Sequence, residues 1–270
     1  MSWKGGVFRQ KKITPLVGDQ VEFEYQDIKE GYIISVDERD NQLTRPPIAN
    51  VDQAIIVTSV KEPNLSVNLL DKFLVLVESK AIQPLLFFTK MDLLTEVEAK
   101  SVKEKLTYYQ QIGYSIEFLS TKDNEMIAQL SIHLNDKVSV FAGQSGVGKT
   151  SILNQIVPGL NLETDDISAS LGRGKHTTRH VELIPFESGL VADTPGFSSL
   201  DFKEIQLENL PQYYPEFAVL QNDCKFRGCM HIQEPKCAVK QALVNGEILK
   251  ERYDNYVQFA EEIKNRKPRY

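Results

Sequence analysis

Residues 138–150 read VSVFAGQSGVGKT, an apolar run followed by a glycine-rich turn that ends in lysine and threonine. The turn matches the pattern G-x-x-x-x-G-K-[ST] of a phosphate-binding loop, and a strand before it and a helix after it supply the required context. The glycines let backbone N–H groups turn towards phosphate, and the start of the helix adds positive potential. The stretch therefore predicts an α/β fold with a site for nucleotide phosphates.

Two residues of this loop have specific expected roles. Lys149 should reach the β and γ phosphates and contribute to catalysis, and Thr150 should ligate Mg²⁺. The predicted binding residues of the loop are Gly143, Gln144, Ser145, Gly146, Val147, Gly148, Lys149, Thr150 and Ser151.

A second motif, Asp193-Thr194-Pro195-Gly196, follows an apolar strand further along the chain. In phosphate-loop enzymes an aspartate at this point holds Mg²⁺, and the amide of the glycine senses the γ-phosphate. Asp193 is therefore predicted to share the Mg²⁺ ion with Thr150, and Gly196 to contact the nucleotide. Alone, such a turn would be an ordinary strand exit. Its place downstream of a phosphate loop favours the functional interpretation.

A third motif, Thr89-Lys90-Met91-Asp92, ends another apolar strand, where ligands of open α/β sheets bind. The Asp92 carboxylate can accept two hydrogen bonds from the N1–H and N2–H₂ edge of guanine, a pattern that adenine does not offer. The stem of Lys90 would pack along the base. Ser120 and Thr121 follow the next strand, so their backbone amides could reach the guanine carbonyl. The motif is weak in isolation, but its position predicts a guanine-nucleotide site.

Around these motifs, apolar strands alternate with amphipathic helices. Strands are predicted over 54–60, 85–88, 114–119, 138–142, 181–186 and 189–192, with helices between the first four. This alternation is typical of a parallel sheet covered on both faces. Residues 163–180 have no apolar period and are predicted as a loop.

All three cysteines of the chain lie in one short segment after these motifs, close to a histidine. Cys224, Cys229, His231 and Cys237 form the ligand set of a closed tetrahedral zinc site. A closed set leaves no open coordination position, which favours one structural zinc ion over a catalytic one. The alternative, three buried reduced cysteines beside an unrelated histidine, explains the clustering poorly.

The composition is that of an ordinary globular protein with more than one domain, at 270 residues, 41% apolar and 25% charged. A net charge of −6 argues against a general nucleic-acid binder. Basic residues near both ends could touch phosphate locally or be solvated. No apolar run approaches the roughly 20 residues that span a bilayer, and no signal sequence is evident. We therefore expect a cytoplasmic monomer without a membrane partner.

The first 47 residues predict a small β unit. Short strands are expected over 14–19, 20–25 and 31–36, and Arg45-Pro46-Pro47 should close the unit because proline cannot continue a strand ladder.

The order of the motifs is unusual, because the base motif at Thr89 precedes the phosphate loop at Gly143. The same sheet can form if the original termini are joined, since termini often lie close together. Together with the loop Gly172-Arg173-Gly174-Lys175-His176-Thr177-Thr178-Arg179 and the cysteine cluster, this order resembles the circularly permuted GTPases that assist small-ribosomal-subunit maturation, the RsgA/YjeQ family. The likeness runs from about Arg39 almost to the C-terminus.

The resemblance implies three domains: an oligonucleotide-binding-like (OB-like) β unit over 1–47, a circularly permuted GTPase domain over 48–202 and a helical zinc domain over 203–270. A complete oligonucleotide-binding barrel has five strands. The segment before the GTPase-like sheet is short for this, so the first strand is expected to be missing.

The resemblance also implies GTP and GDP as ligands, and the small ribosomal subunit with its rRNA as the partner, bound with GTP and released after hydrolysis. Phe197 stands where other GTPases carry a water-orienting glutamine, which predicts slow intrinsic hydrolysis. His176 is one candidate for positioning the water, and otherwise a solvated loop residue. Thr177 or Thr178 should supply a further Mg²⁺ contact, and the resemblance favours Thr177. Competing hypotheses are a phosphate-loop ATPase and a zinc-stabilised RNA-binding module that uses the nucleotide only for structure.

Overall fold

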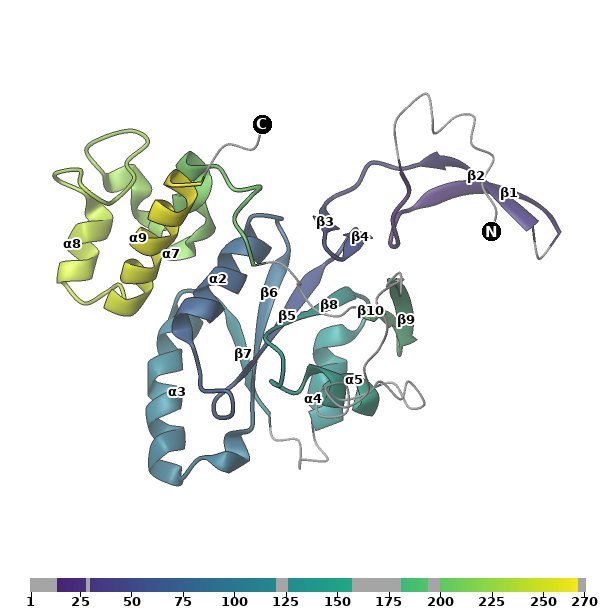
Figure 1. The fold of residues 1–270 in the computed structure, drawn as a ribbon, viewed down its shortest axis with the longest axis horizontal. Coiled ribbons are helices and arrows are strands. Elements are labelled where there is room, and N and C mark those ends of the chain that lie inside the picture. Colours follow the sequence, from purple (N-terminus) through teal and green to yellow (C-terminus); the bar gives the residue numbers. More distant parts are fainter. Residues whose placement is uncertain (1–13, 28–29, 120–125, 157–180, 194–199, 267–270) are drawn as a thin grey trace.

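The structure, a computed structural model, describes residues 14–27, 30–119, 126–156, 181–193 and 200–266 (Figure 1). Its centre is a six-stranded sheet in the order β7-β6-β5-β8-β10-β9. All neighbouring strands are parallel except β9 and β10. The strands are β5 (Gln53–Ser59), β6 (Gln83–Thr89), β7 (Ser115–Phe118), β8 (Val138–Ala142), β9 (Glu182–Phe186) and β10 (Gly189–Asp193). The α/β fold predicted from the alternation of strands and helices is confirmed.

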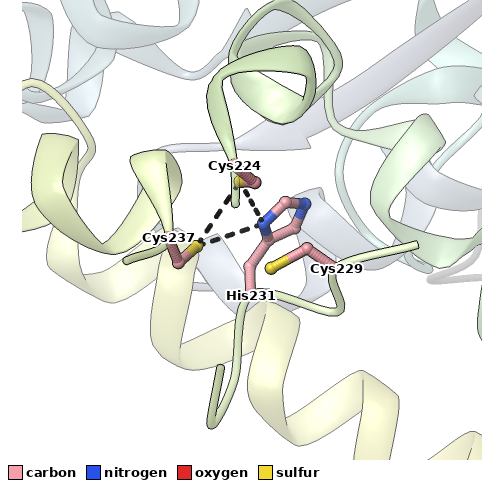
Figure 2. A group of neighbouring side chains, drawn as sticks. All are labelled: Cys224, Cys229, His231 and Cys237. Carbon is pink, nitrogen blue, oxygen red and sulfur yellow. Dashed lines mark hydrogen bonds between the residues drawn. The ribbon is translucent and has the colours of Figure 1, made fainter. Parts of the chain in front are cut away.

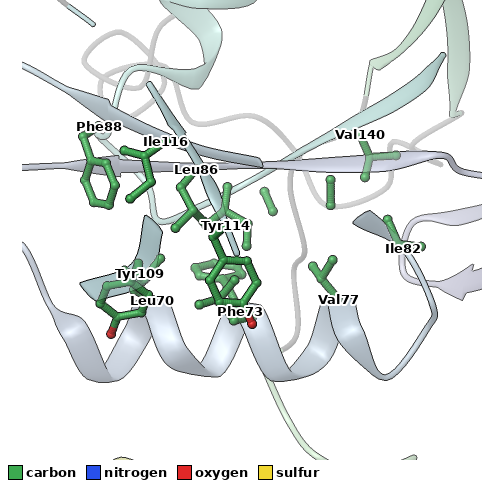
Figure 3. Packing of buried hydrophobic residues seen from close by; sticks show 14 of the residues in the cluster. Leu70, Phe73, Val77, Ile82, Leu86, Phe88, Tyr109, Tyr114, Ile116 and Val140 are labelled. Atoms are coloured by element: carbon green, nitrogen blue, oxygen red, sulfur yellow. The ribbon is translucent and has the colours of Figure 1, made fainter. Parts of the chain in front are cut away.

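Helices cover both faces of the sheet, because successive strand residues point to opposite sides. Ala54 and Ile56 of β5 share a core with α2 (Val67–Glu78) and α3 (Glu96–Gln111). Ile55 and Val57 share a second core with α4 (Met126–Leu134) and α5 (Lys149–Ile156). Figure 3 shows the first core, where apolar side chains of α2 lie against those of the sheet.

Polar side chains fix the starts of the first two helices. The Ser66 hydroxyl accepts a hydrogen bond from the Leu69 N–H at 3.3 Å and caps α2. Thr95 and Glu98 form a reciprocal capping box at the start of α3, in which the Glu98 carboxylate accepts from the Thr95 N–H at 2.7 Å. These caps hold the chain where it leaves the edge of the sheet that carries the predicted site.

The N-terminal β unit contains an antiparallel hairpin of β1 (Val21–Asp27) and β2 (Glu30–Val36). A second, short hairpin joins β3 (Gln42–Thr44) to β4 (Pro47–Ala49). Arg39, between β2 and β3, is bonded to the turn before β1. The Nε and Nη2 atoms of its guanidinium donate to the two carboxylate oxygens of Asp19 at 2.6 and 2.8 Å. Such a two-bond pair is directional and holds the unit together.

Two expectations for this unit are wrong. Residues 14–19 do not form a strand, and only Val17 makes an isolated bridge, to Ile48. Pro47 does not end the ladder but begins β4, paired with Thr44. Proline is tolerated there because the first residue of an edge strand need not donate a ladder hydrogen bond.

The segment after residue 200 is helical, as expected, and has its own core. Its elements are η2 (Leu207–Tyr213), α7 (Pro215–Leu220), η3 (Gln221–Asp223), α8 (Ala238–Val244) and α9 (Lys250–Lys264). Val75 of α2 belongs to the same core, so this unit packs directly on the outer side of that helix. In Figure 1 the unit lies beside α2, away from the β1–β2 hairpin.

A largely buried ion network fastens this unit to the sheet domain. The Arg252 guanidinium on α9 donates to Asp71 of α2 at 2.7 Å and to Glu216 of α7 at 2.5 Å. Asp71 also accepts hydrogen bonds from Tyr109 of α3 and from Asn255 of α9, at 2.7 and 2.6 Å. Burial raises the pKa of Asp71, while the arginine and the three donated hydrogen bonds oppose this rise. Four helices therefore meet at one arginine.

The division at 47 and 202 stays a prediction. Leu43 of β3 and Ile48 of β4 contribute to the core of the sheet domain, so the short hairpin packs with that domain. Among the described residues, no helix is both long and apolar enough to cross a bilayer.

Candidate nucleotide site and metal centre

The phosphate loop connects β8 to α5, as the sequence predicts. Its first glycine is indispensable for two reasons: Gly143 has φ 140°, and a Cβ there would lie 2.2 Å from the Val57 carbonyl oxygen. Gly146 and Gly148 also have positive φ angles, of 79° and 100°. Only glycine adopts such angles readily, and this backbone can turn its N–H groups towards an anion.

Lys149 is the first residue of α5 and lies over this loop. Its ammonium group donates to the carbonyl oxygens of Gly143 and Gln144 at 2.8 and 2.7 Å. Thr150 and Ser151 follow in the first turn of the helix, and both are half-buried. The loop, the lysine and the threonine thus lie together, which is the arrangement that binds the phosphates and Mg²⁺ of a nucleotide.

The predicted base motif follows β6 directly. Thr89, its first residue, is buried and donates from its hydroxyl to the Val147 carbonyl of the phosphate loop at 2.6 Å. Lys90 takes the left-handed conformation with φ 62°, and Met91–Leu93 form a 3-10 turn that includes the exposed Asp92. The Thr89 bond therefore ties the base motif to the phosphate loop.

The sheet order explains how these distant segments meet. β6 and β8 both end at the same edge, with β5 between them. Neighbouring strands are about 4.8 Å apart, so the strands β6 and β8 are separated by roughly 10 Å. β10 lies on the other side of β8 and ends at Asp193, at this same edge. The edge can therefore hold a base over β6 and phosphates over β8.

Several predicted site residues lie outside the described residues: Ser120, Thr121, His176, Thr177 and Gly196. For Asp193 the structure describes the backbone only. Residues 60–64, which follow β5, also lie at this edge and were not predicted from the sequence to do so. Pro63 of this segment lies against the phosphate loop, since a Cβ on Gly146 would be 3.8 Å from its Cδ. The only sequence signal is its position at the carboxyl end of a central strand.

The predicted metal ligands come together in the C-terminal unit (Figure 2). Cys224 follows η3, Cys229 and His231 lie on the next loop, and Cys237 precedes α8. Their ligand atoms all lie within 4.8 Å of one another. His231 has φ 56°, and its ring faces the thiols.

The distances among three of the four predicted ligands, Cys224, His231 and Cys237, fit a tetrahedral zinc ion. With Zn–S near 2.3 Å and Zn–N near 2.05 Å, tetrahedral geometry requires S···S of about 3.8 Å and S···N of about 3.6 Å. The Sγ atoms of Cys224 and Cys237 are 3.8 Å apart. The Nδ1 atom of His231 is 3.6 Å from the first sulfur and 3.3 Å from the second. Nδ1 is therefore the nitrogen that faces the predicted ion.

The cluster is closed and shielded. Burial raises the pKa of the Cys229 thiol to about 12 and lowers the pKa of His231, which keeps the imidazole neutral and able to ligate. The backbone N–H of Ala238 points at the Cys224 sulfur at 3.4 Å, and that of Lys240 at the Cys237 sulfur at 3.5 Å. Burial raises the pKa of the Cys237 thiol, and the Lys240 N–H opposes this rise.

One residue that organises the metal loop was not found from the sequence. The Glu234 carboxylate accepts hydrogen bonds from the N–H groups of Met230, Ile232 and Gln233 at 2.9, 3.0 and 3.1 Å. Burial acts to raise its pKa, but these backbone bonds lower the pKa below the usual value. Glu234 therefore holds the turn that carries His231.

The fold and the two site motifs define the class of the protein. It is a phosphate-loop GTPase with a circularly permuted motif order, in which the base motif after β6 precedes the loop after β8. The chain belongs to the RsgA GTPase family. The model of the RsgA GTPase family matches residues 36–203, and that of the RsgA N-terminal domain matches residues 4–33.

Relatives cover nearly the whole chain. The "Small ribosomal subunit biogenesis GTPase RsgA 2" of Oceanobacillus iheyensis is 58% identical over 98% of this chain and 90% of its own length. The RsgA of Bacillus subtilis is 54% identical over 98% of this chain and 89% of its own length. The family resemblance inferred from the motif order is therefore confirmed.

Solved structures agree with the fold. The crystal structure of YloQ, described as a circularly permuted GTPase, is 49% identical with a TM-score of 0.85, covering 98% of this chain and 86% of that one. The crystal structure of YjeQ from Thermotoga maritima is 40% identical with a TM-score of 0.87, covering 98% and 90%.

Proposed function

We propose that the protein hydrolyses GTP during late assembly of the small ribosomal subunit, binding the subunit and its rRNA in the GTP state and leaving after hydrolysis. The observation that carries this proposal is the Thr89–Val147 hydrogen bond, which joins a guanine-type base motif to a phosphate loop at one sheet edge. Relatives that cover nearly the whole chain are named for biogenesis of the small subunit.

The roles of the site residues follow from their places on this edge. Asp92 reads the guanine base and Lys90 packs along it, while the amides of Ser120 and Thr121 reach the guanine carbonyl. Lys149 binds the β and γ phosphates. Thr150 and Asp193 hold Mg²⁺, and the Gly196 amide senses the γ-phosphate.

Hydrolysis depends on the loop around His176. Phe197 cannot orient water, so His176 positions the attacking water once the partner has bound, and Thr177 completes the Mg²⁺ coordination. Both residues lie outside the described part of the chain, and their roles rest on the resemblance and on the chemistry of their side chains.

The metal in the C-terminal unit is a single structural zinc ion, held by Cys224, Cys229, His231 and Cys237. The support is the gathering of the four donors within 4.8 Å of one another and the fit of the distances among Cys224, His231 and Cys237 to a tetrahedral ion. Because all four donors come from the chain, the ion stabilises the fold and takes no part in hydrolysis.

The segment after the Asp193 motif offers a route from the nucleotide state to the partner. Glu204 accepts a hydrogen bond from Thr44 of β3 at 2.8 Å and pairs with Lys80 at the end of α2. Arg266, just after α9, donates to the carbonyl of Phe202 at 2.6 Å. A rearrangement beside the γ-phosphate would therefore be transmitted both to the N-terminal β unit and to the C-terminal unit.

Binding to small ribosomal subunits tests the proposal. The protein should sediment with purified small subunits in the presence of a non-hydrolysable GTP analogue, and much less in the presence of GDP. We expect the protein to be monomeric and cytoplasmic. Equal sedimentation in both nucleotides would sink the GTP-state model. Preferential hydrolysis of ATP would favour the competing ATPase, and RNA binding that is independent of nucleotide would favour the zinc-stabilised module.

A further inference from the structure

The segment that follows β5, residues 60–64, lies between the base motif and the phosphate loop. It occupies this place because β5 stands between β6 and β8 in the sheet. Ser59, which is buried, starts the segment: its hydroxyl donates to the Lys61 carbonyl at 2.5 Å and accepts from the Lys61 N–H at 3.3 Å. The chain therefore leaves the strand in a fixed turn.

Two lysines cross between this segment and the base motif in opposite directions. Lys61 of the segment donates from its ammonium to the carbonyl of Leu93 at 3.2 Å. Lys90 of the base motif donates from its ammonium to the carbonyl of Glu62. The Val60 N–H adds a backbone bond to the Thr89 carbonyl at 3.2 Å. The two loops are thus joined on both sides of Asp92.

The same segment also contacts the phosphate loop. The Pro63 ring lies against Gly146. Pro63 and Asn64 of the segment line a cavity of about 10 Å³ together with Gln144 and Val147 of the phosphate loop. The segment therefore touches both halves of the proposed nucleotide site, between the places of the base and the phosphates.

We propose that residues 60–64 are a brace that holds the base motif in register with the phosphate loop, and that Lys61 is its positioning residue. The inference rests on the proposed guanine site. A loop that is already held in its binding conformation loses less freedom when the nucleotide binds, so the brace raises affinity for guanine nucleotides. Lys61 does not touch the nucleotide and acts through Leu93 and the turn that presents Asp92.

The test replaces Lys61 with methionine, which keeps the length of the side chain and removes the donor. Lys100→Met is the matched control, because it makes the same charge change on an exposed lysine of α3. Loss of one hydrogen bond should weaken GDP binding by about 3- to 10-fold. Lys61→Arg, which keeps a donor, should retain most of the affinity. Binding is followed by the fluorescence of a labelled GDP, with ADP as competitor.

Kinetics and a double-mutant cycle separate positioning from general stability. Lys61→Met should raise the KM for GTP and leave kcat unchanged, because the γ-phosphate lies at the far side of the phosphate loop. In an Asp92→Ala background, which has lost the base contact, Lys61→Met should weaken GDP binding much less than it does alone. A merely structural effect would be additive and would lower kcat as well.

The outcomes are distinguishable. If the wild-type protein did not prefer GDP over ADP, the proposed guanine site would be overturned, and the brace with it. If the wild type preferred GDP while Lys61→Met bound it as well as Lys100→Met does, the brace alone would be overturned. Equal melting temperatures of the two variants would show that both are folded when compared.

Discussion

Asp92 is the residue proposed to select the base of the nucleotide. Asp92 is exposed on the turn after β6, and its carboxylate can accept from two guanine donors at once. Asp92→Asn should therefore weaken GDP binding and favour XDP, because the amide presents a donor where guanine also donates. GDP and XDP affinities of both proteins, measured side by side, check this. Unchanged GDP affinity would remove Asp92 from the base pocket.

Cys229 is one of the four proposed metal ligands, and its replacement should affect folding without changing the nucleotide site. It is buried in the core of the C-terminal unit, on the far side of α2 from the sheet. Cys229→Ser should lower zinc content and thermal stability while sparing nucleotide affinity, because structural zinc contributes folding free energy on the order of 10 kcal/mol. Elemental analysis and thermal melting measure these effects. A wild-type preparation without zinc would contradict the assignment.

The types of residue explain why the phosphate loop and the cysteine cluster could be predicted from the sequence, whereas the residues that position the loops around them could not. The glycines and Lys149 of the phosphate loop, and the clustered cysteines, form local patterns that are read directly from the sequence. Lys61 and Glu234 are single charged residues in ordinary loops. The hydrogen-bond partners of both are backbone carbonyl or N–H groups, which leave no pattern in the sequence, and Lys61 also pairs with Glu98 at 3.9 Å.

At the scale of elements, the phosphate loop depends on close packing between neighbouring strands. A Cβ on Gly143 would lie 2.2 Å from the Val57 carbonyl of β5, whereas a Cβ on Gly113 would meet nothing within 4 Å. Both glycines have positive φ, so Gly113→Ala controls for backbone strain. Gly143→Ala should abolish detectable GDP binding, and Gly113→Ala should only lower stability, by about 1 kcal/mol. Calorimetric titration with GDP compares them, and tight binding by Gly143→Ala would contradict this account.

Helices and strands could be predicted from the sequence where the pattern of apolar residues and the residues that mark the ends of an element indicated the same structure. The strands of the central sheet were found as apolar runs, because β5, β6 and β8 are buried on both faces. The N-terminal unit was less predictable. Pro47 is tolerated in β4 only because the strand is short and lies at an edge, and that depends on pairing with β3.

In the molecule as a whole, Arg252 joins the sheet domain to the C-terminal unit. Its burial could not be read from the sequence, because its partners come from helices that begin far away along the chain. Arg252→Met should reduce the free energy of unfolding by about 3–5 kcal/mol, since Asp71 and Glu216 are left buried without a counter-charge. Urea unfolding measures this change.

A compensating variant supplies the control for that experiment. Arg252→Met combined with Asp71→Asn and Glu216→Gln removes the unpaired charges and should recover a large part of the lost stability. Equal instability of the single and triple variants would show that the lost packing of the arginine side chain, and not the charge, is responsible.

The partner is expected to activate GTP hydrolysis, and phosphate release at saturating GTP measures this activation. The free protein should turn over slowly, and purified small ribosomal subunits should accelerate it by at least about tenfold. His176→Ala should reduce the stimulated rate much more than the affinity for GTP, and Lys149→Ala should weaken both. A free protein that already hydrolyses GTP as fast as the subunit-bound one would contradict the account.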